Sequence, residues 1–173
     1  QLEGIAYYVL NTNPMGISGT AATGAPFPEG SVIEIIDATG AVVGNTVILN
    51  PEGSYNIVVP ANSVPPLVIK ATADGATTMY SVSPTLVNGT VNVTPITTLI
   101  AARLSPTGDP ANLAAEVQAG TATVTTATTT AKTQEIVTVL APLSTALGVS
   151  TDPLTGAFVA NGTGYDQLLD SVK

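Results

Sequence analysis

Short β-branched runs separated by turn residues fill the first half of the chain. The runs cover residues 31–37, 41–49, 54–59, 67–72, 77–82 and 90–93. The stretches Asp37-Ala-Thr-Gly40 and Asn50-Pro-Glu-Gly53 suit tight turns, because Asp or Asn bonds to its downstream backbone and Gly accepts a positive φ. Many short strands at this spacing favour an antiparallel β-sandwich over a parallel sheet with helical crossovers.

From Thr94 onward, the hydrophobic period changes to that of a helix. Thr94 precedes Pro95, which places a capping side chain before a residue suited to the first helical position. Apolar residues then recur at helical spacing, at Ile96, Leu99, Ile100 and Leu104. Asp109-Pro110 repeats the arrangement and opens a second short helix, through Val117, that Gly120 can end.

The threonine-rich tract at residues 121–134 is compatible with either a loop or a helix, since β-branched Thr lowers helix propensity. A helical stripe nevertheless runs through it and continues to Gly148, with apolar positions at Val124, Ala127, Ala131, Ile136, Val139, Leu140, Leu143 and Leu147. Pro142 is expected to kink this helix, because it removes a hydrogen bond to Thr138. Residues 164–172 predict a last short helix.

Strands followed by helices predict an α+β fold. We expect an N-terminal strand or linker at residues 1–15, an antiparallel β-sandwich at 16–93 and a small helical subdomain at 94–173. The helices would form a separate subdomain or pack on one end of the sandwich.

Composition excludes several kinds of chemistry. The formal charge is −8, only 9% of residues are charged, and His, Cys and Trp are absent. Imidazole or thiolate metal sites and His-dependent nucleophiles are therefore impossible, and we expect no cofactor and no metal. Four basic residues offer little to phosphates, so no nucleic-acid partner is expected. The longest apolar runs fall short of the roughly 18 residues of a membrane span, so we expect no membrane insertion.

Three consecutive stretches carry a family resemblance: Gly16-Ile-Ser-Gly-Thr20, residues 24–40, and Asn50-Pro-Glu-Gly-Ser-Tyr-Asn-Ile-Val-Val59. Together they resemble the carboxypeptidase regulatory-like domain, with its transthyretin-like (prealbumin-like) sandwich, over residues 16–93. At the turn where that family has Asp before Gly, this chain has Pro51-Glu52, and Gly53 is kept. The helical half looks like the region that follows such domains in bacterial surface and lipoprotein-type proteins. The resemblance implies a non-catalytic extracellular module for spacing, adhesion, assembly or carbohydrate contact.

Glu34 and Lys70 are the candidate residues for covalent chemistry. Related surface sandwiches sometimes contain an isopeptide bond between Lys and Asn or Asp, formed with the help of a buried acid, and Lys70 is the only basic residue of the β half. The simpler interpretation, which we favour, is a solvent-facing cross-strand pair of the two side chains.

The N-terminal segment is a candidate for strand donation between subunits. Its residues Ile5, Tyr7, Tyr8, Val9 and Leu10 belong to an uncharged apolar run that Asn11-Thr-Asn-Pro14 separates from the rest. Open sandwich edges with almost no Lys to guard them would accept such a strand. The alternatives are a strand within its own domain or a linker from a preceding module.

The sequence therefore predicts a non-enzymatic structural or adhesive module of a bacterial extracellular or cell-surface protein, its signal segment absent from this chain. The alternatives are a self-assembling filament subunit that uses strand addition, and a carbohydrate-binding module. Expected partners are other copies of the chain, other surface proteins, or glycans. The 4% aromatic content and the lack of Trp supply little for sugar stacking.

Overall fold

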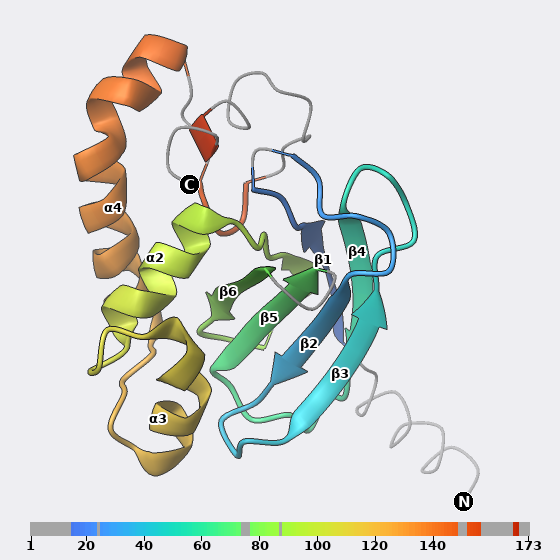
Figure 1. Cartoon of the computed structure of the whole chain (residues 1–173). Coiled ribbons are helices and arrows are strands. Elements are labelled where there is room, and N and C mark those ends of the chain that lie inside the picture. The colour runs from blue at the N-terminus through green and yellow to red at the C-terminus, as the bar shows by residue number, and fades with distance from the viewer. Residues whose placement is uncertain are drawn as a thin grey trace, which may run out of the picture.

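The computed structural model describes residues 15–23, 25–73, 77–86, 88–148, 152–156 and 168–169. Within these residues, strands form two sheets (Figure 1). The strands are β1 (Met15–Thr20), β2 (Val32–Ile36), β3 (Val42–Val47), β4 (Ser54–Val59), β5 (Leu67–Ala73), β6 (Thr77–Ser83) and β7 (Gly89–Thr90). One sheet has the order β4-β1-β7 and the other the order β3-β2-β5-β6. The predicted α+β class, with mostly antiparallel strands, is confirmed.

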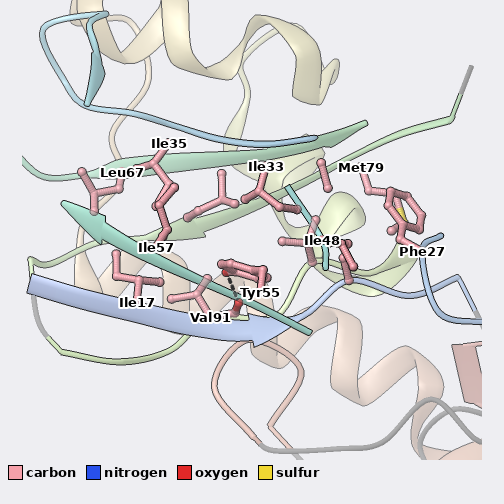
Figure 2. Packing of buried hydrophobic residues seen from close by; sticks show 14 of the residues in the cluster. Ile17, Phe27, Ile33, Ile35, Ile48, Tyr55, Ile57, Leu67, Met79 and Val91 are labelled. Atoms are coloured by element: carbon pink, nitrogen blue, oxygen red, sulfur yellow. Dashed lines mark hydrogen bonds between the residues drawn. The ribbon is translucent and has the colours of Figure 1, made fainter. Parts of the chain in front are cut away.

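The two sheets enclose the first hydrophobic core. Alternation along β2 and β4 buries Ile33, Ile35, Tyr55 and Ile57, while the residues between them face outward. Figure 2 shows these side chains meeting between the sheets together with Ile17, Phe27, Ile48, Leu67, Met79 and Val91. Because side chains alternate between the two faces of a strand, each sheet has one apolar face. Packing the apolar faces of the two sheets together removes both from water.

Four helical segments follow the strands in the described part of the chain. They are α2 (Pro95–Leu104), the 3₁₀ turn η1 (Pro110–Asn112), α3 (Leu113–Ala119) and α4 (Thr126–Leu147). Thr94 caps α2 through a reciprocal pair of bonds with Thr97, and Asp109 caps η1, as the sequence predicts. Gly120 and Gly148 end α3 and α4 in the left-handed region, with φ of 78° and 68°.

The helices add a layer on the outer face of β5 and β6 (Figure 1). Val68 and Val82 point out of the sheet into a second core that contains Ile96 and Ile100 of α2. The same core includes Leu113, Val124, Ile136, Leu154, Leu168 and Leu169. The helices therefore cover a face of the sheet rather than one end of the sandwich.

The structure corrects two details of the expectation and decides a third that the sequence left open. The β1–β7 pair is parallel, whereas an antiparallel sandwich was expected throughout. Val139 was placed on the inner stripe of α4, but its side chain is 71% exposed. The tract 121–134 divides, with a loop to Thr125 and a helix from Thr126 that continues past Pro142 to Leu147.

Two predicted elements lie mostly or wholly outside the described residues. The proposed strand at 5–10 falls entirely outside them. Of the expected helix at 164–172, the structure describes only Leu168 and Leu169, which are helical and buried. No described helix has the length and apolar character needed to cross a membrane.

Candidate functional site

Glu34 and Lys70 lie directly opposite each other on neighbouring strands of the four-stranded sheet. The register pairs Glu34 of β2 with Lys70 of β5. On the outer sides, Glu34 pairs with Asn45 of β3 and Lys70 pairs with Tyr80 of β6. Both charged side chains are half-buried on the outer face. The single ion pair found among the described residues joins Lys132 to Glu135 on α4, at 3.0 Å.

This geometry bears on the possible crosslink. Lys70 and Asn45 are separated by β2, so their backbones lie about 9–10 Å apart at the usual strand spacing. Glu34 is half-buried, unlike the buried acid expected of such a crosslink. The arrangement suits a cross-strand charge pair worth a few tenths of a kcal/mol, and the crosslink stays a prediction.

Asp37 organises the turn that follows β2. Its carboxylate accepts hydrogen bonds from the hydroxyl and N–H of Thr39, the latter at 2.9 Å, and from the Val64 N–H at 3.0 Å. Burial opposes ionisation, but these donors outweigh it and hold the pKa of Asp37 below its ordinary value. The side chain therefore acts as a structural anchor that ties two loops together.

Tyr55 fastens the two edges of the three-stranded sheet across its central strand. Its hydroxyl, buried in the sandwich core, donates to the Val91 carbonyl just beyond β7 (Figure 2). Burial raises the pKa of this phenol, so it stays protonated as a donor at neutral pH. Gly19 lies beside this contact, since a Cβ added there would be 2.0 Å from the Val91 oxygen. The sequence placed Tyr55 on a strand but gave no signal of this partner.

Strands β3 and β4 form an open corner of the sandwich. Each is the last strand of its sheet, and Figure 1 shows them side by side. At one end they almost touch, because a Cβ on Gly44 would lie 3.3 Å from the Val58 oxygen. At the other end, where residues 48–53 connect the two strands, lies a groove of about 350 Å³, here called the corner groove. It is lined by Ser18, Thr46, Val47, Leu49, Asn50, Ser54, Tyr55 and Asn56.

The corner groove combines apolar and uncharged polar surface. None of the described residues that line it is charged. Leu49 is 79% exposed and Val47 41% exposed at its rim, while Ser54 and Asn56 add polar groups from β4. Such a lining suits an extended chain with aliphatic or tyrosine side chains, which have both apolar and hydrogen-bonding parts. The sequence feature that indicated this uncharged surface was the lack of charged residues at positions 42–49.

A second groove, of about 400 Å³, runs beside the first half of α4. It is lined by Pro84, Thr126, Thr129, Thr130, Thr133, Gln134, Val137, Asp152, Pro153, Leu154 and Thr155. The hydroxyls of Thr129 and Thr133 are buried there with no hydrogen-bond partner in the described structure. These groups can bond a neutral polar ligand, but none of the described residues that line the groove has an aromatic ring to stack on a sugar. The carbohydrate-binding alternative stays a prediction.

Within the part of the chain that the structure describes, no three acidic side chains gather closely enough to hold a metal ion. The carboxylate of Glu116 accepts hydrogen bonds from the hydroxyls of Ser105 and Thr107, which fixes the loop after α2.

Comparisons with protein-family models, curated proteins and solved structures find no match. The similarity to the carboxypeptidase regulatory-like domain therefore stays a prediction.

Proposed function

We propose that the chain is a non-enzymatic structural or adhesive module of a bacterial extracellular or cell-surface protein, built on a transthyretin-like sandwich. The observation that carries the proposal is the open corner, where two uncharged edge strands end side by side. Unpaired strand edges present rows of backbone donors and acceptors, and proteins normally guard them with charge when they are not used for binding. Val42 on β3 and Val58 on β4 are 54% and 60% exposed, so apolar surface accompanies both edges.

The strand order supports the transthyretin-like part of the proposal. Two small sheets face each other over one core, and the residues of the resemblance, 16–93, supply all of their strands except Met15 of β1. The composition, poor in Lys and rich in Thr, Gly and Asn, fits an exported surface protein. An antibody against this chain should label intact cells that make the full-length protein; labelling only after permeabilisation would contradict the surface location.

A filament subunit is the second candidate, and the same open corner favours it. A sandwich that accepts a strand from a neighbour and donates one of its own can build a chain of subunits. Light scattering should therefore show a mass that rises with protein concentration. Deletion of residues 1–13 should abolish the particles seen by negative stain. A mass that stays monomeric at every concentration would contradict self-assembly while leaving the adhesive module standing.

A further inference from the structure

The groove of about 400 Å³ beside the first half of α4, here called the α4 groove, has two walls of different chemistry. One wall is α4 itself, where Thr126, Thr130 and Thr133 recur at helical spacing and line the groove. The other wall includes the turn at residues 152–155. The volume falls within the range of about 300–1,000 Å³ that is usual for small-molecule sites.

Hydrogen bonds from Asn92 hold the second wall in place. The side chain of Asn92 donates to the Gly156 carbonyl at 2.6 Å, and its backbone N–H donates to the Leu154 carbonyl at 2.7 Å. Leu154 is itself buried in the second core, to which Ile136 of α4 also belongs. Both walls are therefore anchored to one core, and the groove is formed before any ligand enters it.

Asp152 determines the charge of the α4 groove. Among the described residues that line the groove, it is the only charged one. Its Oδ1 accepts hydrogen bonds from the Leu154 N–H at 2.9 Å and from the Thr155 N–H at 3.2 Å, whereas Oδ2 bonds to none of the described residues. In a chain of formal charge −8, a groove with one available carboxylate oxygen favours a cation over an anion.

Two threonine hydroxyls on the α4 wall lack a hydrogen-bond partner. Thr129 is 4% exposed, and the hydroxyl oxygens of Thr129 and Thr133 are buried without a hydrogen bond in the described structure. The two residues are four positions apart, so they lie on the same face of the helix. Because buried polar groups in native proteins nearly always have a partner, a group bound in the adjoining groove can supply the missing donor.

We propose that the α4 groove binds a primary ammonium group at the end of an aliphatic chain. An ammonium has three donors and no acceptor, which suits Oδ2 of Asp152 together with the hydroxyl oxygens of Thr129 and Thr133. The methylene chain lies against Val137 and Leu154, since such stems bury along apolar surface. A guanidinium fits less well, because its paired donors need both oxygens of a carboxylate and Oδ1 is already engaged.

Nuclear magnetic resonance titration of the isotope-labelled full chain with pentylamine tests this site. We expect saturable shifts of the amide signals of residues 129–137 and 154–155. Pentanol has the same alkyl chain without the charge and should bind at least about tenfold more weakly, because charge-assisted hydrogen bonds are the stronger ones. Equal binding of the two probes, or no saturable shift in these residues, would refute the ammonium site.

Three variants assign the binding to individual groups. Asp152→Asn keeps an oxygen that can accept from the two backbone N–H groups but removes the charge, and should raise the Kd for pentylamine by about tenfold. Thr129→Val keeps the side-chain shape without the hydroxyl and should raise the Kd by about fivefold. Glu52→Gln removes the same charge from an exposed turn outside the groove and should leave the Kd unchanged. Circular dichroism verifies that each variant folds.

The control variant decides whether the carboxylate acts locally. If Asp152→Asn and Glu52→Gln bind pentylamine equally well, the assignment of the ammonium to the groove is wrong. An unchanged Kd for Thr129→Val would overturn the part given to the buried hydroxyl.

A lysine side chain and a free alkylamine share this chemistry, and a further probe separates them. Nα-acetyl-lysine methylamide carries the same ammonium on a peptide unit. Binding as tight as that of pentylamine would support the ammonium site with lysine side chains as its ligand. Binding of pentylamine alone would support the same site with free amines as its ligand.

Discussion

Replacement of Gly19 by Ala tests the close approach of β1 to β7. An added Cβ would lie 2.0 Å from the Val91 oxygen, 2.7 Å from its carbonyl carbon and 3.1 Å from Cε1 of Tyr55. Ordinary contact needs about 3.5 Å, so the chain at Val91 would have to move away by roughly 1.5 Å. The obstacle is backbone, which cannot rotate aside as the end of a flexible side chain can.

The displacement would weaken several bonds at once. The Val91 N–H donates to Ser18 O at 2.8 Å, the Val93 N–H donates to Thr20 O at 3.0 Å, and Tyr55 donates to Val91 O. Each contributes about 1 kcal/mol, and overpacking costs a further 1–3 kcal/mol or so. We expect Gly19→Ala to lower the free energy of unfolding by about 4–6 kcal/mol if all three bonds are lost, a large share of a typical total of about 5–15 kcal/mol.

Urea unfolding followed by circular dichroism measures this loss. Gly89→Ala is the matched control, because it makes the same change on β7 where nothing lies within 4 Å of the new Cβ. It should stay within about 0.5 kcal/mol of the unmodified protein. A Gly19→Ala protein as stable as the Gly89→Ala protein would refute the close parallel contact between β1 and β7.

Three further predictions concern buried polar side chains that make hydrogen bonds. Tyr55→Phe leaves the Val91 carbonyl without its donor and should cost about 1–3 kcal/mol in urea unfolding. Because burial raises the pKa of Tyr55, its protonated form stabilises the fold. The difference in unfolding free energy between the unmodified protein and Tyr55→Phe should therefore shrink as the pH rises above about 10, the ordinary pKa of Tyr. Asp37→Asn should destabilise the protein by about 1–2 kcal/mol at neutral pH. Folding lowers the pKa of Asp37, so the ionised carboxylate stabilises the fold. Urea unfolding at decreasing pH should therefore show the stability difference between the unmodified protein and Asp37→Asn shrinking below pH 3.8, the ordinary pKa of this group. A stability difference independent of pH would contradict that role. Thr94→Ala should lower the melting temperature through loss of about 1 kcal/mol of capping energy, and Thr94→Ser should restore most of it.

Local signals in the sequence predicted most elements correctly. The strand at Ser54–Val59 agrees at both ends, because a turn ending in Gly53 precedes it and alternation sets its faces. The cap at Thr94 was predictable too, since capping depends on residues only three positions apart. The start of α4 was harder to place, because the tract offers several Thr residues as possible caps, of which Thr125 is used, and the intrinsic preferences of Thr oppose a helix there.

Long-range pairings could not be read from the chain. Nothing in Gly89-Thr90 distinguishes a parallel from an antiparallel neighbour, and Gly19 gave no local sign of its contact with Val91. Val47 and Leu49 belong to a run of ordinary strand residues. Their exposure at an open corner depends on which strand ends each sheet, and topology decides that.

Hydrogen–deuterium exchange at low and high protein concentration tests the central claim, that the open corner is a binding surface, with a second copy of the chain as the partner. The account predicts that amides in residues 5–10, and those amides of β3 and Leu49 that do not bond to β2, become more protected at high concentration. Amides in α2 and the first half of α4 should be unchanged. Equal exchange of residues 42–49 at both concentrations, in a sample shown to self-associate, would contradict the account.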